Sequence, residues 1–160
     1  MATVVVAPIA DKITVIVSKS EPQDACDRLA AFGINAVPGE AGTDYVWFPQ
    51  RMKCGVERKT VSNLLGSLAD RQLVEQTHKG VKAFDFYIIL VEGDMRETGD
   101  GFLEYYAPRD PRSSPVGMVK SKWRWESVQG MLLDLQLLGA MIVPCKSFDY
   151  ARKIAMLATT

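Results

Sequence analysis

The sequence contains few of the residues on which disulfide-rich proteins and zinc proteins depend. It has three cysteines and one histidine among 160 residues. Cys26, Cys54 and Cys145 are odd in number, widely spaced and free of a C-x-x-C pattern, which argues against a disulfide framework and a zinc site. Such cysteine usage fits a reducing compartment, so we expect a cytoplasmic protein. His78 lies in a polar stretch, which favours an exposed side chain over a general base.

The chain also lacks an excess of charge and a long hydrophobic run. Its 19 basic residues balance its 19 acidic residues, so attraction to a polyanion must come from a local patch. The apolar run at 4–9 is short, follows no basic segment and contains Pro8. It therefore resembles neither a signal peptide nor a membrane-spanning helix, and we expect no membrane partner.

What the chain does contain is enough apolar sequence for one core. A hydrophobic content of 48% over 160 residues indicates a single domain, 1–160. Strand-like and helix-like patterns alternate, which predicts an α/β domain with a mixed central β-sheet flanked by helices. Expected strands lie at 12–17, 34–37, 44–48, 53–59, 84–92 and 140–145, and expected helices at about 20–33, 61–68, 71–78, 123–138 and 148–157.

Two further features of this organisation can be predicted. The strands at 44–48 and 53–59 are separated by a short loop, which indicates an antiparallel pair. The segment at about 93–122 has no clean period and is rich in Gly, Pro and Ser, so we expect a long irregular insertion. We find no sequence pattern of a helix-hairpin-helix domain.

Three adjacent charges, Glu57, Arg58 and Lys59, end the expected strand at 53–59. They could form a solvated strand end or a site for chemistry. Alternate side chains of a strand share a face, so Glu57 and Lys59 point one way and Arg58 the other. Asp44, at the start of the antiparallel partner, can then lie near Glu57.

Two carboxylates and a lysine at one sheet edge suit the hydrolysis of phosphodiesters. Oxygen ligands from Asp44 and Glu57 would hold Mg²⁺ or Mn²⁺, with Glu92 and Glu21 as further candidate ligands. Lys59 would position the attacking water or stabilise the charge of the transition state. No small-molecule cofactor is expected.

Several motifs around these residues are similar to those of one known family. The family pattern is G-D, a spacer, V-E-R-K, three residues and D, and here Thr43-Asp44 precedes Val56-Glu57-Arg58-Lys59 and Asn63. Next come Asn63-Leu64, Ser67-Leu68, Arg71-Gln72 and Gln76, then the strand that ends at Glu92. The chain thus resembles the XPF-type structure-specific endonuclease domains of the PD-(D/E)xK, restriction-endonuclease-like superfamily.

The resemblance implies a restriction-endonuclease-like fold and a metal-dependent endonuclease. It also implies a homodimer, and the backbone carbonyl of Arg58 as a further metal ligand. Two departures stand out: Asn63 replaces the last aspartate of the motif, and only Glu21 is acidic where relatives carry an aspartate with arginine and glutamate after the first strand. A compact form of this kind suits a bacterial or phage protein, in the latter case acting in the host cytoplasm.

Other residues are candidates for contact with DNA. Arg58 either contacts phosphate or pairs with an acid. For Glu92, the alternative to metal binding is a capping or ion-pair role. The resemblance to the XPF-type family adds Arg71 and Gln76 as candidate DNA-binding residues. The richest patch combines cations with an indole, which can stack on an unpaired base, although a tryptophan here can also belong to the core. It consists of Lys120, Lys122, Trp123 and Arg124.

Two functions follow for this chain. The favoured one is a Mg²⁺- or Mn²⁺-dependent endodeoxyribonuclease that cuts branched or otherwise structured DNA in recombination, repair or DNA processing. The alternative is a non-catalytic nuclease-like module that binds DNA or a protein partner. The missing acid after the first strand is the feature that favours the module.

Overall fold

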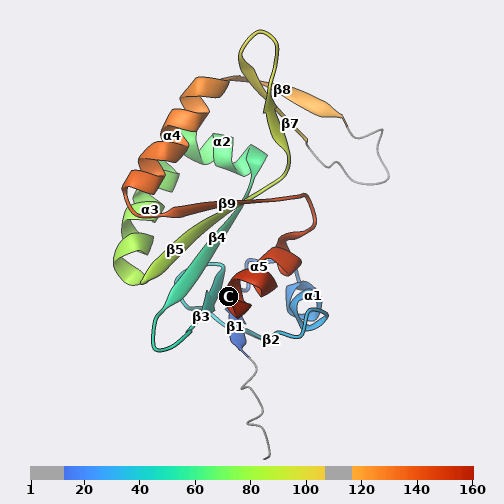
Figure 1. Ribbon diagram of the computed structural model, residues 1–160, viewed down its shortest axis with the longest axis vertical. Helices are drawn as coiled ribbons and strands as arrows, with labels where there is room; N and C mark the ends of the chain where they lie inside the picture. Colours follow the sequence, from blue (N-terminus) through green and yellow to red (C-terminus); the bar gives the residue numbers. More distant parts are fainter. Residues whose placement is uncertain (1–12, 107–116) are drawn as a thin grey trace, which may run out of the picture.

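The computed structural model describes residues 13–106 and 117–160. Figure 1 shows one large sheet with helices on both sides and a smaller sheet at one end. In chain order the elements are β1 (Thr14–Val17), α1 (Ala25–Ala30), β2 (Asn35–Pro38), β3 (Tyr45–Trp47), β4 (Cys54–Thr60), α2 (Val61–Ala69), α3 (Gln72–Ala83), β5 (Phe86–Glu92), β6 (Met95–Glu97), β7 (Phe102–Tyr106), β8 (Met118–Arg124), α4 (Trp125–Leu137), β9 (Met141–Cys145) and α5 (Tyr150–Thr159).

The large sheet has six strands in the order β2-β1-β3-β4-β5-β9. β1 pairs with β2 in parallel, as do β4 with β5 and β5 with β9. β3 runs antiparallel to both of its neighbours, β1 and β4. The predicted α/β architecture with a mixed sheet is therefore confirmed, including the antiparallel pair β3–β4.

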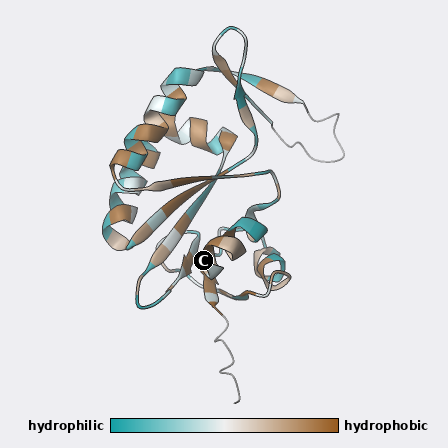
Figure 2. Cartoon of the chain, in the orientation of Figure 1, coloured by the Kyte–Doolittle hydropathy of each residue, from teal (hydrophilic) through white to brown (hydrophobic). Residues whose placement is uncertain are grey.

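Side chains from the two faces of this sheet form two separate apolar clusters. On one face Val56 and Leu90 pack with α1 and α5, and on the other Tyr87 and Ile89 pack with α2, α3 and α4. Strand geometry explains the division, because consecutive residues point to opposite faces. Strand β5 is buried on both faces, and Figure 2 shows it mostly in the hydrophobic colour. Glu57 and Lys59 pair with Ile89 and Val91 and therefore lie on the second face, that of α2, α3 and α4. Arg58 pairs with Leu90 and lies on the first face, that of α1 and α5.

The helices on the second face begin and end with recognisable local signals. The hydroxyl of Thr60 caps α2 by accepting a hydrogen bond from the backbone N–H of Asn63, at 3.3 Å. Helix α3 was expected to end near His78 but continues to Ala83. Gly80 lies within this helix, and a Cβ there would clash with the Tyr87 ring. This glycine allows close packing of the helix on the sheet.

The expectation of an irregular insertion at 93–122 is wrong for most of its described part. β6, β7 and β8 form a three-stranded antiparallel sheet beyond the end of the large one (Figure 1). Its first hairpin turns at Gly101, which has a positive φ of 82°. Along β8, exposed Lys120, Lys122 and Arg124 alternate with the half-buried Ser121 and Trp123, which is a strand period. Residues 107–116 lie outside the described part of the chain.

Smaller corrections concern the first helix. A helix was expected at about 20–33, but α1 is shorter: it starts at Ala25, with Asp24 in the N-cap position, and ends at Ala30. Phe32, within the expected range, lies beyond the helix and is half exposed. Among the described residues, no helix is both long enough and apolar enough to cross a membrane.

Candidate active site

The carboxyl end of β4 places three charged side chains on two faces of the sheet. Glu57 and Lys59 share one face, and the Nζ of Lys59 lies 3.0 Å from the Oε1 of Glu57. Both side chains are 14% exposed. This ion pair is therefore largely shielded from water yet still reachable from the surface.

Asp44 joins this pair from the neighbouring antiparallel strand. Tyr45 pairs with Val56, so Asp44 lies one step beyond, opposite Glu57. Its Oδ2 accepts a hydrogen bond from the backbone N–H of Arg58 at 2.8 Å, and its own carbonyl accepts one from the N–H of Ser18. Two backbone contacts thus hold Asp44 beside the end of β4.

Asp44 is the carboxylic acid with the strongest perturbation at this site. Burial, and secondly the negative charge of Glu57, raise its pKa from 3.8 to about 7. The backbone hydrogen bond from Arg58 and the charge of Lys59 act in the opposite direction but are weaker. The two carboxyl groups are thus close enough for one to oppose ionisation of the other. A cation bound between them would remove this repulsion.

The sequence reasoning missed Thr43 as a member of the site. Its hydroxyl lies 2.9 Å from the Oε2 of Glu57 and 3.2 Å from the carbonyl oxygen of Val56, and can donate its proton to either. It thereby orients the carboxylate that also binds Lys59. The available signal was its position before Asp44, where the family pattern has a glycine without a side chain.

A pocket of about 210 Å³ opens beside Glu57 on the same face. Its lining includes Gln76 and Lys79 from α3 together with Tyr87. The Oε1 atom of Gln76 is buried and has no hydrogen-bond partner within the described ranges. The structure therefore brings Gln76 together with Glu57 and leaves its amide oxygen available to a ligand.

Arg58 lies on the opposite face in a closed network of charges. Its Nε is 2.7 Å from the Oε2 of Glu21, and its Nη1 is 2.6 Å from the Oε2 of Glu92. The guanidinium also stacks over the ring of Tyr150, 4.6 Å from its centroid. Of the two roles considered for Arg58, this geometry matches the pairing with acids.

The same network corrects the view of Glu21 and Glu92 as further metal ligands. Both carboxylates are more than nine-tenths buried, and both bind Arg58 instead. The remaining oxygen of Glu92 accepts the backbone N–H of Phe148 at 2.9 Å, and Glu21 also accepts the hydroxyl of Tyr45. The reason is strand parity, since Glu92 has the register of Arg58 and not that of Glu57.

The donor set at Asp44 and Glu57 fits a hard divalent cation that keeps part of its water shell. Mg²⁺ binds characteristically through one or two carboxylates plus substrate phosphates and water. Over 13–106 and 117–160 there is no cluster of three or more His, Cys, Asp or Glu residues that could enclose a metal by itself. A cation held by Asp44 and Glu57 would take its other ligands from water or from substrate phosphates.

The remaining candidates for DNA contact lie away from this site or are placed differently from the prediction. Lys120 pairs with Asp100 and stands over the Phe102 ring, which Arg124 also covers. Trp123 does not stand among these cations, because it packs against the apolar cluster under α4. Arg71 is exposed in the turn before α3, and its left-handed backbone has a φ of 61°.

The chain is thus an α/β domain with a mixed six-stranded sheet, and two carboxyl groups and a lysine lie together at the end of its central strand β4. Residues 12–155 match the family model of the ERCC4 domain, so the chain belongs to the ERCC4 domain family. A search of curated proteins gives no match.

Solved structures of XPF from Aeropyrum pernix have the same fold. One is 24% identical with a TM-score of 0.67, and it covers 91% of this chain and 63% of that one. A second, in complex with DNA, is 23% identical with a TM-score of 0.63 and covers 92% and 66% respectively. The chain thus spans less than two thirds of the length of these archaeal proteins.

Proposed function

We propose that this chain is a divalent-metal-dependent endodeoxyribonuclease that cuts branched or otherwise structured DNA. The observation that carries the proposal is the grouping of Asp44, Glu57 and Lys59 on one face at the carboxyl end of β4. Membership of the ERCC4 family supports it, as does the DNA complex of the similar archaeal fold.

Each of these residues has a distinct task in hydrolysis. Asp44 and Glu57 would hold Mg²⁺ or Mn²⁺, which when bound neutralises charge on the scissile phosphate and lowers the pKa of water. Thr43 keeps the Glu57 carboxylate in place through its hydroxyl. Lys59 provides a fixed ammonium group 3.0 Å from Glu57, where it can orient the attacking water or stabilise the negative charge of the transition state.

The test is a cleavage assay on single-stranded, duplex, flap and four-way DNA with Mg²⁺ or Mn²⁺. Glu57→Ala should lower the cleavage rate at least about a thousandfold, by loss of a ligand and of the partner of Lys59. Asp27→Ala, an exposed acid of α1 on the other face of the sheet, serves as the matched control and should cut normally. Cleavage that persists in Glu57→Ala would remove the assignment. Structure-dependent binding without any cleavage would favour a non-catalytic module.

The same proposal includes a homodimer acting in DNA repair or recombination. Leu133 and Leu137 lie one turn apart on α4 and are 55% and 78% exposed, so this helix presents an apolar surface to solvent. Light scattering of the wild type should give twice the mass of the chain, and Leu137→Glu should give the monomer. A monomeric wild type would contradict the dimer and leave the nuclease assignment unaffected.

A further inference from the structure

Phe148 is an exposed aromatic residue held in an unfavourable backbone conformation. It lies between β9 and α5, its φ is 63°, and 66% of it is exposed. A bulky residue seldom adopts this left-handed conformation, since its Cβ is crowded there. Neither apolar cluster includes it, so burial does not explain why a phenylalanine occupies the position.

A contact with a buried acid fixes the backbone of Phe148. Its N–H donates to the Oε1 of Glu92 at 2.9 Å, and the Oε2 of Glu92 binds Arg58. The backbone N–H of Arg58 in turn donates to Asp44. Phe148 is thus linked through three consecutive contacts to a proposed metal ligand, and lies at the same carboxyl edge of the sheet.

The surroundings of Phe148 combine cations with further aromatic rings. Lys146 and Asp149, on either side of it, line a pocket of about 430 Å³ together with Trp125, Arg152 and Lys153. The acids of this pocket are Asp94 and Asp149, so its three cations are in excess. Ser147, directly before Phe148, lines a second pocket of about 230 Å³ with Tyr105 and Tyr106.

We propose that Phe148 is a stacking platform for an unpaired base of the DNA strand that enters the candidate active site, with Lys146 and Lys153 on the flanking phosphates. An exposed ring with cations beside it is the arrangement by which proteins hold single-stranded nucleic acid. The inference rests on the proposed function and names the part of the substrate that this edge recognises. The contacts through Glu92 and Arg58 would keep the platform in a fixed position relative to the cutting site.

The test uses the full chain without divalent metal, so that binding is measured apart from cleavage. The probes are a duplex with a single-stranded arm, carrying 2-aminopurine at the first unpaired position, and a blunt duplex of equal length. The wild type should quench 2-aminopurine by stacking. Phe148→Ala should abolish the quenching and weaken binding of the armed duplex at least about fivefold, as expected for one lost base–aromatic stack. Its affinity for the blunt duplex should change less than about twofold.

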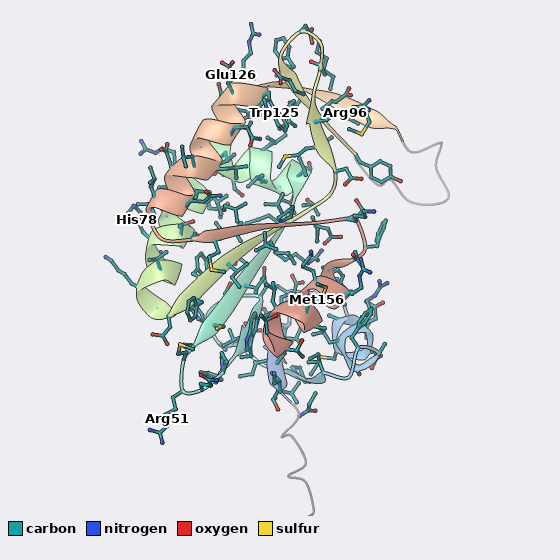
Figure 3. All side chains as sticks on the ribbon, viewed as in Figure 1. Arg51, His78, Arg96, Trp125, Glu126 and Met156 are labelled. Carbon is teal, nitrogen blue, oxygen red and sulfur yellow. The ribbon has the colours of Figure 1, made fainter. Side chains whose placement is uncertain are left out.

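Two variants serve as controls. Phe48→Ala removes a ring that is 57% exposed in the loop between β3 and β4, the loop that contains the labelled Arg51 in Figure 3. That loop lies at the opposite edge of the sheet, so this variant should bind as the wild type does. Phe148→Trp should retain both quenching and affinity.

Three results would overturn the platform. They are a Phe148→Ala variant that quenches and binds normally, equal weakening on both DNAs, and a wild type that gives no quenching. The first two leave the nuclease assignment in place, because that depends on the effect of Glu57→Ala on cleavage.

Discussion

The two faces of the sheet at the end of β4 carry similar charged residues, which differ in how completely they are paired with other protein groups. On the face of α1 and α5, Arg58 has two carboxylate partners and an aromatic ring, and both of those carboxylates are nearly inaccessible. On the face of α2 and α3, Glu57 and Lys59 form one pair, and Asp44 has a raised pKa. The Oε1 of Gln76 there has no hydrogen-bond partner among the residues that the structure describes.

This difference separates a structural arrangement from a functional one. The charges around Arg58 have protein partners on every side, so a ligand would gain little from binding there. The group around Glu57 has two acids that oppose each other and one lysine, so a cation and a phosphate would improve its electrostatics. Adjacent residues of one strand can thus differ completely in role because side chains alternate between faces.

Removal of Arg58 should have the largest effect on stability. Arg58→Met leaves Glu21 and Glu92 buried without their counter-charge, and we expect the free energy of unfolding to fall by about 3–5 kcal/mol. Urea denaturation at pH 7 measures this loss. Lys59→Met should cost less than half as much, because its partner Glu57 lines a pocket open to water. It should nevertheless abolish cleavage, because the ammonium group is lost.

A triple variant sharpens the test of Arg58. Adding Glu21→Gln and Glu92→Gln to Arg58→Met should recover part of the lost stability, since no buried charge then lacks a partner. Equal losses in Arg58→Met and Lys59→Met would show that the two faces do not differ in the proposed way.

Asp44, on the face of α2 and α3, should make the stability of the protein depend on pH. Asp44 has a pKa of about 7 in the folded state against 3.8 for an unperturbed aspartate, so between these values only the folded state keeps the proton. Stability should therefore fall as pH rises from about 4 to about 7, by on the order of 2–4 kcal/mol.

Asp44→Asn tests this dependence by removing the titrating group. In EDTA the variant should be more stable than the wild type at pH 8 and nearly equal to it at pH 4. Thermal unfolding across this range gives the difference between the two proteins, which cancels the other acids. Parallel profiles for both proteins would contradict a raised pKa at Asp44.

Strand parity explains how much of this comparison could be predicted from the sequence. The alternation in V-E-R-K was enough to place Glu57 with Lys59 and to separate Arg58 from them, because the period of a strand is fixed by backbone geometry. The partners of Arg58 were not predictable in the same way. Glu21 and Glu92 reach it across the sheet, and sequence proximity contains no information on that contact.

Other failures arose where the decisive contact is distant in sequence. The helix expected at about 71–78 continues through Gly80, where the Tyr87 ring packs too closely for a Cβ. Trp123 looks like part of a basic patch until the alternation along β8 turns it inward. In each case local composition was outweighed by packing against an element that the sequence does not place nearby.

A pair of glycine substitutions tests how α2 and α3 pack on their face of the sheet. Gly80→Ala places a Cβ in a steric clash with the Tyr87 ring, so we expect α3 to shift and carry Gln76 away from Glu57. We expect a loss of about 1–3 kcal/mol in unfolding free energy, together with slower cleavage. Gly66→Ala is the matched control, because it lies within α2 and its Cβ would have open space. It should stabilise by about 0.4–1 kcal/mol, and destabilisation by both would point to helix disruption in general.

The smallest effect on stability should appear at Phe148, whose N–H bonds Glu92 on the face of Arg58. Ala keeps a Cβ in the left-handed conformation whereas Gly does not, so Phe148→Gly should be more stable than Phe148→Ala by about 1 kcal/mol. This reverses the usual order of the two residues, and thermal unfolding of both variants measures it. Both should lose the stacking of an unpaired base equally, because both lack the ring. If Phe148→Ala proved the more stable, the left-handed backbone at residue 148 would carry no strain, and the hydrogen bond from its N–H to Glu92 would not be needed to hold that conformation.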